Sequence, residues 1–137
     1  MNKEMADRIR FLCKAVGPAK QTIIVARKDI DALQQKLSQA TTERMKNIIL
    51  GAIEQRQSQQ KKAEAVVVSF MSTVDGLDLE ERNVMIQLYI KRKKWREIDS
   101  LEGKRMNARE VNTIYKRALR RMALNAESMS CLAEKEK

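Results

Sequence analysis

The sequence predicts an all-α protein made of a long N-terminal helical hairpin, similar to a coiled coil, and a smaller C-terminal helical unit. Three observations lead to this fold class. The 137 residues include only four glycines and one proline, which is too little turn punctuation for a many-stranded β fold. Apolar residues recur at steps of three and four over most of the chain, the period of an α-helix. Side chains that cap helices precede two of these segments, at Asp78 and Asn107.

The first 76 residues are expected to form a helical arm that serves in oligomerisation. An apolar stripe over residues 2–16 predicts a first helix, which Gly17-Pro18 should stop. The next segment alternates steps of three and four between its apolar residues over about two heptads, as a coiled-coil seam does. A polar break follows, in which Thr41 or Thr42 can cap the next helix.

A third helical segment covers residues 43–74, and its middle, residues 54–62, carries only polar side chains. Such a stretch is either exposed or packs through polar contacts that tolerate a kink. Two amphipathic helices joined by a short break are expected to fold back as an antiparallel hairpin. Apolar surface left over is expected to pair with a second copy of the chain. The residues predicted to form that dimer contact are Ile23, Ile30, Leu33, Leu37, Ile49 and Ile53.

A second unit is expected over residues 77–126, after the turn signal Asp75-Gly76. Asp78, with Glu81 three positions later, matches a capping box and therefore predicts the start of a helix. The basic cluster that begins at position 91 should end this helix.

Trp95, Ile98 and Leu101 have helical spacing and predict a short helix, with Trp95 as a buried anchor against the helix that follows. After a turn, Asn107 and Glu110 repeat the capping pattern and predict the start of the last helix. Two helices joined by such a turn form a helix-turn-helix. The C-terminal unit is therefore expected to be a helix-turn-helix domain.

Most of the positive charge of the chain lies in this unit. Between positions 91 and 121, twelve basic residues stand against four acidic ones, a net +8 of the formal +10 of the whole chain. A helix that enters a DNA groove needs such cations to meet the phosphates, while arginine and asparagine can each bond a base edge with two hydrogen bonds. The residues predicted to contact bases are Ala108, Arg109, Asn112, Thr113 and Lys116. The residues predicted to contact phosphates are Lys93, Lys94, Arg96, Lys104, Arg105, Arg117, Arg120 and Arg121.

The run LEERNVMIQLYI, followed by WREIDSL and NAREVNTIYKRALRRM, resembles region 4 of sigma-70-family factors. It is more similar still to phage late-gene transcription activators of the ArpU and RinA type. In those families a Glu-Ile pair opens the first helix of the motif, which matches Glu97 and Ile98, and a valine follows the cap of the recognition helix, which matches Val111. Asp99 departs from the pattern, because alanine usually stands there.

The resemblance covers about a third of the chain, residues 79–124. It implies a sequence-specific transcriptional regulator of phage or prophage origin that activates late genes, binds double-stranded DNA as a homodimer and contacts RNA polymerase. It assigns no role to individual residues of the N-terminal half.

Several function classes are disfavoured. The chain has no histidine, and Cys13 and Cys131 are not at metal-ligand spacing. We therefore expect no metal, no cofactor, no small-molecule substrate and no enzymatic activity. No apolar run approaches the length of a membrane span, so we expect no membrane partner and a cytoplasmic location in a bacterial or phage-infected cell. Residues 127–137 are expected to form a flexible tail.

Two alternatives remain at this point. In the first, the helical hairpin is the active part of a phage assembly or packaging factor, and the basic unit only docks on nucleic acid or an acidic partner. In the second, Trp95 is exposed and stacks on a base of single-stranded nucleic acid or RNA.

Overall fold

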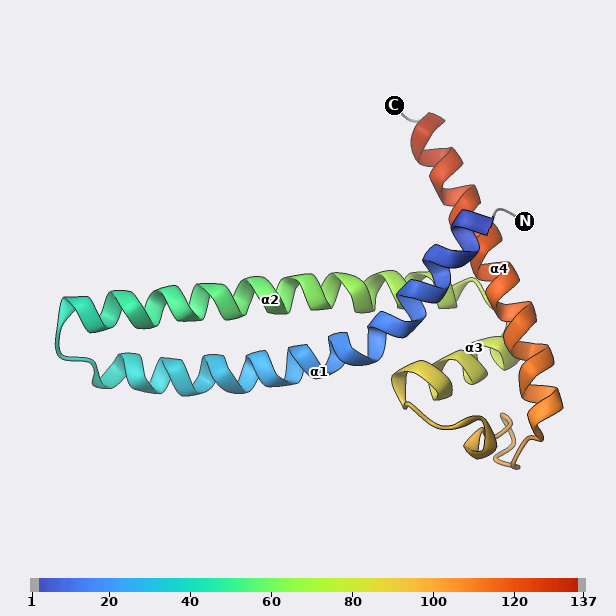
Figure 1. Cartoon of the computed structure of the whole chain (residues 1–137), viewed down its shortest axis with the longest axis horizontal. Helices are drawn as coiled ribbons and strands as arrows, with labels where there is room; N and C mark the ends of the chain where they lie inside the picture. Colours follow the sequence, from blue (N-terminus) through green and yellow to red (C-terminus); the bar gives the residue numbers. More distant parts are fainter. Residues whose placement is uncertain (1–2, 136–137) are drawn as a thin grey trace. The chain divides into compact units, whose positions relative to one another are not determined.

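The computed structural model describes residues 3–135, with side chains described as far as Ala126. Within this part of the chain all regular elements are helical, so the all-α prediction is confirmed (Figure 1). The elements in chain order are α1 (Lys3–Gln39), α2 (Glu43–Asp75), α3 (Leu79–Met85), the π-helix η1 (Ile86–Ile90), the 3-10 helix η2 (Trp95–Glu97) and α4 (Ala108–Lys135). The only extended pairing among the described residues is an isolated antiparallel bridge between Asp99 and Arg105.

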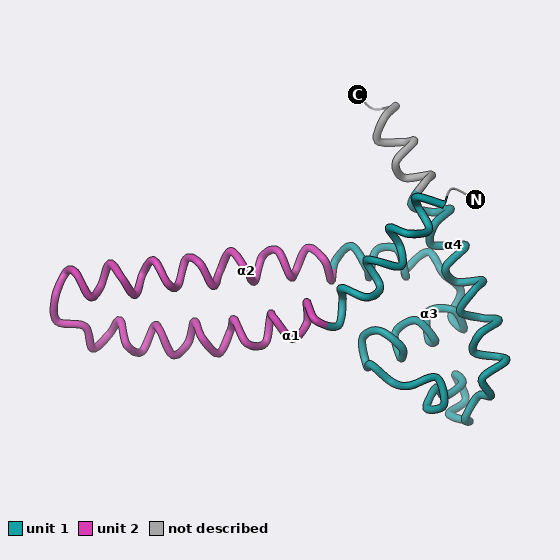
Figure 2. Tube along the Cα trace, viewed as in Figure 1, with its two compact units in different colours: residues 1–17, 68–137 teal, residues 18–67 magenta. Residues whose placement is uncertain are grey.

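The chain forms two compact units (Figure 2). The hairpin unit contains residues 18–67. The composite unit contains residues 1–17 and 68–137, and so combines both ends of the chain. These limits differ from the expected boundary at position 76, because the apolar stripe of the first residues is buried inside the composite unit. Ile9, Cys13 and Val16 are all buried there.

The hairpin unit confirms the expected antiparallel pair. Its parts of α1 and α2 run side by side and are joined by residues 40–42 (Figure 1). Thr42 caps α2, since its Oγ1 accepts a hydrogen bond of 3.2 Å from the Met45 N–H. Ala26 and Ile53 are buried in the seam, and Asp29 pairs with Arg56 across it at 3.3 Å.

Helix α1 continues through Pro18, so the prediction that Gly17-Pro18 stops the first helix is wrong. A proline inside a helix removes one backbone donor and crowds the preceding turn. Here buried side chains hold the helix on both sides of the proline, Val16 before it and Ala19 after it. The division between the two units falls at this proline.

The core of the composite unit lies between α3 and α4. A buried cluster joins Val84 of α3, Ile98 and Met106 of the connecting segment, and Val111 and Ile114 of α4, with Leu88 packed against it. Both predicted caps are present and start these helices at the expected positions. The Glu81 N–H donates to Asp78 Oδ1 at 2.8 Å, and the Glu110 N–H donates to Asn107 Oδ1 at 2.9 Å.

The helix that begins with α3 ends at the basic cluster, as expected, but through a π-turn. The Lys91 N–H donates to the Ile86 carbonyl at 3.0 Å, and Arg92 takes a left-handed conformation with φ of 54°. A left-handed residue after the last helical turn is a common way to end a helix, although glycine is its usual occupant.

The predicted short helix over Trp95, Ile98 and Leu101 is wrong. Only a single 3-10 turn forms, Trp95–Glu97, and Ile98 is already extended, with ψ of 127°. Ile98 is buried, but Leu101 is exposed at the tip of a tight turn. Gly103, with φ of 82°, allows this turn to close. The segment before α4 is therefore a small bridged loop rather than a helix.

Gln87 explains why this loop forms. Its side chain is buried and binds the backbone of Asp99 in both directions: Nε2 donates to the Asp99 carbonyl at 2.7 Å, and Oε1 accepts from the Asp99 N–H at 3.0 Å. Asn83 donates to the same carbonyl at 2.8 Å. The amide of Gln87 thus supplies the hydrogen bonds that the backbone N–H and carbonyl of Asp99 would otherwise form within a helix. The helical spacing of Trp95, Ile98 and Leu101 gives no indication that a side chain distant in sequence will bind this backbone in place of a helix.

Gln87→Leu is expected to lower the free energy of unfolding by about 1 to 3 kcal/mol, because it leaves the partly buried Asp99 backbone N–H and carbonyl without the bonds from Gln87. Gln57→Leu on the hairpin, where the side chain is exposed, is the control and should change stability by less than about 0.5 kcal/mol. Urea unfolding followed by circular dichroism measures both. Equal losses for the two variants would contradict a structural role for the Gln87 amide.

Candidate nucleic-acid interface

The side chains predicted to contact bases are exposed together on the first turns of α4. These are Ala108, Arg109, Asn112, Thr113 and Lys116. The opposite face of the helix is buried in the core, at Val111, Ile114, Ala118 and Met122. The cap at Asn107 fixes where this face begins, and Glu110 is drawn toward the cap, since its Oε1 accepts 2.8 Å from Asn107 Nδ2. The sequence thus predicted the position of this face correctly.

Two residues predicted to contact phosphates have an acidic partner within the loop. Asp99 Oδ2 lies 3.4 Å from Lys93 Nζ, and Asp99 Oδ1 lies 3.2 Å from Arg105 Nε. Arg105 also donates to the Arg96 carbonyl at 2.9 Å. The hydrogen bond from Arg105 and the nearby Lys93 hold the pKa of the Asp99 carboxyl below its usual value. Lys93 and Arg105 therefore stabilise the loop rather than standing free.

Arg117 and Arg121, also predicted to contact phosphates, pair with Glu81. The Glu81 side chain is fully buried, and its Oε2 lies 3.3 Å from Arg117 Nε and 3.4 Å from Arg121 Nε. Its Oε1 completes the capping box of α3 by accepting from the Asp78 N–H at 3.2 Å. A buried carboxylate needs such partners because leaving it unpaired is costly. These two arginines join α4 to α3.

The remaining predicted phosphate contacts are exposed and have no ion pair within the described part of the chain. They are Lys94, Arg96, Lys104 and Arg120. Arg109 and Lys116 of the base-contacting set share this state. The structure therefore sorts the basic cluster into residues that hold the fold and residues whose charge is left to solvent or a ligand.

A row of aromatic rings, which sequence reasoning missed, crosses the composite unit. Phe70 of α2 lies 6.3 Å from Tyr89, Tyr89 lies 6.3 Å from Tyr115 of α4, and Tyr115 lies 5.1 Å from Trp95, all between ring centroids. The two tyrosine hydroxyls share a hydrogen bond of 2.7 Å. Burial, followed by this bond, raises the pKa of Tyr89. No sequence spacing relates these four residues, which come from four different elements.

Trp95, the end of this row, is 38% exposed. The prediction that it is a buried anchor is therefore wrong. It does contact α4, as expected, but through the edge of one ring against Tyr115 with the planes 75° apart. The reason is the loss of the short helix, since the ring now stands on a single 3-10 turn beside the core rather than inside it.

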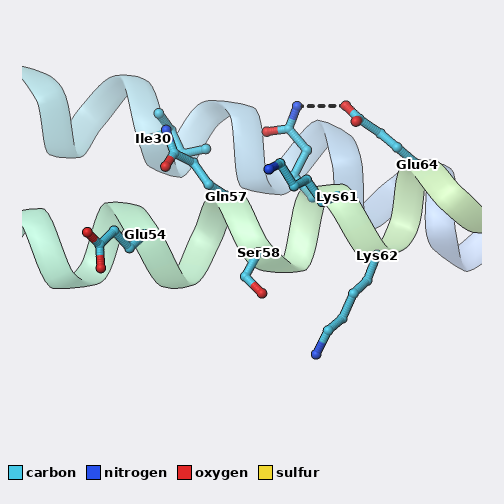
Figure 3. Close-up of a pocket in the computed structure, with 8 residues that line it drawn as sticks. Ile30, Glu54, Gln57, Ser58, Lys61, Lys62 and Glu64 are labelled. Atoms are coloured by element: carbon cyan, nitrogen blue, oxygen red, sulfur yellow. Dashed lines mark hydrogen bonds between the residues drawn. The ribbon is translucent and has the colours of Figure 1, made fainter.

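The hairpin unit contains a shallow hollow of about 770 Å³ at the polar stretch of α2 (Figure 3). Ile30 of α1 lines it together with Glu54 and Gln57, while Lys62 extends away from α1. Gln60 Nε2 donates to Glu64 Oε1 at 3.0 Å along α2. The α2 helix continues through this stretch.

All six residues predicted to form a dimer contact are at least partly buried within the single chain. Ile53 is buried, and Ile23, Ile30, Leu33, Leu37 and Ile49 are half-buried. The large apolar side chains that remain exposed on the hairpin unit are Ile24, Val25, Met45, Ile48 and Leu50. The prediction of these six residues as a dimer contact thus omitted the internal contact that uses the same positions.

Other kinds of site are not found in the described residues. No group of three or more His, Cys, Asp or Glu side chains could hold a metal ion, and no helix searched has the length and apolar character needed to cross a membrane. Cys13 is buried, and desolvation raises the pKa of its thiol to about 12, which keeps the thiol protonated and a poor nucleophile. The expected tail begins within α4, which runs to Lys135, and residues 136–137 lie outside the described part.

Comparisons of the chain with family models, with curated proteins and with solved structures found no match.

Glu81→Gln is expected to reduce the free energy of unfolding by about 1 to 3 kcal/mol, because the neutral amide weakens the bonds to Arg117 and Arg121 inside the protein. Glu80→Gln is the matched control. The Glu80 carboxylate is 53% exposed and, among the described residues, pairs only with Arg117, at 3.5 Å, so its loss should change stability by less than about 0.5 kcal/mol. Thermal and urea unfolding report both values, and a control variant as unstable as Glu81→Gln would refute the buried pairing.

Stability should fall on acidification. A bond from the Glu81 backbone N–H holds the pKa of Asp78 below 3.8, and Arg105 does the same for Asp99. The unfolded chain therefore takes up protons first, so stability present above about pH 4 is lost as the pH falls through the lowered values. Urea midpoints measured from neutral pH down to about pH 2 should show a smaller acid loss in an Asp78→Asn, Asp99→Asn double variant. An unchanged acid profile in that variant would count against the assignment.

Proposed function

We propose that this protein is a sequence-specific double-stranded DNA-binding regulator of transcription that reads base edges with the exposed face of α4. One observation carries the proposal: Arg109, Asn112 and Lys116 stand together on the first turns of a capped helix, opposite a fully buried face. Side chains of these types can bond guanine and adenine edges in a major groove. The first turns of a recognition helix are where such contacts are made.

The surrounding charges support the same function. Lys94, Arg96 and Lys104 precede α4, and Arg120 follows on the same exposed face of the helix as Arg109. Contacts to phosphates fix the orientation of a protein on the duplex and make its affinity depend on salt. Because no acidic group neutralises these side chains within the described residues, they are available for phosphates. Arg117 and Arg121 are left out of this set, because they are paired with Glu81.

We further propose that the protein acts as a dimer and activates late genes of a phage or prophage. The dimer is supported by the apolar side chains exposed on the hairpin unit, such as Met45 and Ile48. Activation and contact with RNA polymerase rest on the resemblance of residues 79–124 to the phage activators. The loop before α4 differs from the helix that a helix-turn-helix would have there, so the proposal rests on α4 itself rather than on that motif.

The test is selection of bound fragments from a random pool of duplex DNA at about physiological salt. The wild-type protein should enrich one motif, whose half-site spacing would report the dimer. An Arg109→Ala, Asn112→Ala double variant should lose or change preference at specific positions, with Arg109→Ala costing about 1 to 3 kcal/mol at one base pair.

Lys62→Ala is the control, because it removes one exposed positive charge from the hairpin unit. It should leave the enriched motif unchanged. A wild-type protein that enriches no motif, or an Arg109 variant that weakens binding to all sequences alike, would refute base reading by α4.

A further inference from the structure

Trp95 combines exposure with a fixed position. It is the only tryptophan of the chain, and its side chain is partly open to solvent while one edge packs on Tyr115. Tyr115 is held in turn by the hydroxyl of Tyr89, whose ring packs on the fully buried Phe70. The exposed indole is thus the outer end of a row of rings anchored in the core.

The backbone around Trp95 is also fixed. The Glu97 N–H donates to the Lys94 carbonyl at 2.8 Å, and the Lys94 N–H donates to Glu97 Oε1 at 3.2 Å. The Arg96 carbonyl accepts a bond from Arg105. Binding of a ligand over the indole would therefore cost little conformational entropy, because the Trp95 segment is already ordered.

Two cations stand next to Trp95 in the sequence. Lys94 and Arg96, its two neighbours in sequence, are exposed and have no ion pair within the described residues. The nearby carboxylates are otherwise engaged: that of Glu97 bonds the Lys94 backbone, and that of Asp99 is taken by Lys93 and Arg105. A polyanion with apolar patches between its charges fits such a surface.

We propose that Lys94, Trp95 and Arg96 form a second DNA contact, separate from the reading face of α4. In this contact the indole covers the apolar sugar face of the duplex backbone, and the two cations bind the phosphates on either side. The inference rests on the proposed function. Tyr115, which supports the indole, directly precedes Lys116 in α4. The contact with the DNA backbone therefore lies next to the helix that is proposed to read the bases.

The ring geometry favours a duplex backbone over a single strand. Surfaces that bind single strands usually stack successive bases on exposed aromatic faces. Here the next ring in the row, Tyr115, is half-buried and its hydroxyl is bonded to Tyr89. One partly exposed indole between two cations offers a single apolar contact, which suits one sugar of a backbone whose phosphates are already bound.

The experiment uses the wild-type full-length protein and the duplex obtained by selection. Tryptophan emission is recorded during titration, while the anisotropy of labelled DNA measures binding independently. Because there is one tryptophan, any change in its emission reports position 95. We expect emission to shift to shorter wavelength and to saturate together with the anisotropy.

Variants separate the ring from the charges. Trp95→Ala should weaken binding about tenfold, on selected and random duplexes alike, without changing the dependence on salt. Lys94→Ala and Arg96→Ala should each lower the slope of log affinity against log salt by about one. Trp95→Phe, which keeps a ring against Tyr115, should retain more affinity than Trp95→Ala and shows that the loss does not arise from misfolding.

The outcomes are distinct. DNA binding seen by anisotropy with unchanged tryptophan emission would overturn this contact and leave the reading by α4 standing. Tighter binding of a single strand than of the duplex, with a change in emission, would overturn the duplex contact in favour of base stacking. No binding of any DNA by anisotropy would overturn the proposed function together with this inference.

Discussion

The buried carboxylate of Glu81 is the interaction on which the orientation of α4 depends. It lies in the first turn of α3 with no exposed surface, accepts from the Asp78 N–H, and pairs with Arg117 and Arg121. A charge in that position must be matched by cations at short range. Because both arginines lie on one flank of α4, the pairing fixes the rotation of this helix about its axis. The cap at Asn107 fixes where the exposed face begins, and this contact two turns further along helps to hold its direction.

A second constraint shapes the segment that leads into α4. Gln87 bonds the backbone of Asp99 from inside the core, and the Asp99 carboxylate then collects Lys93 and Arg105. The same loop that prevents a short helix also places Trp95 at the surface. The fold of the loop therefore decides which cations are paired. Lys93 and Arg105 bind Asp99 and stabilise the loop, whereas Lys94, Arg96 and Lys104 stay exposed. The net charge of +10 does not distinguish the paired cations from the exposed ones. Only the exposed ones are candidates for binding phosphates.

The composite unit requires both ends of the chain. Ile9, Cys13 and Val16 from the first residues are buried in the same unit as α3 and α4, and an added Cβ at Gly17 would lie 3.2 Å from the Tyr89 carbonyl. The candidate binding surface is therefore supported by contacts that are distant in sequence. Bringing such distant segments together costs loop-closure entropy that local helices do not cost. A fragment that began at position 77 would lack part of its own core.

The sequence by itself determined the elements that depend on local chemistry. The helical period, the caps at Asp78 and Asn107, the turn of the hairpin at Thr42 and the face of α4 all follow from spacing and from side chains that bond their own backbone nearby. Only the tertiary structure decided the features that arise between elements. Pro18 remains helical because each side is buried, Ile98 is extended because Gln87 binds its neighbour, and Arg117 and Arg121 pair with a carboxylate more than thirty residues away. The physical reason is that burial and pairing between distant segments outweigh the local conformational preferences of the residues involved. A short stretch of sequence contains only those local preferences.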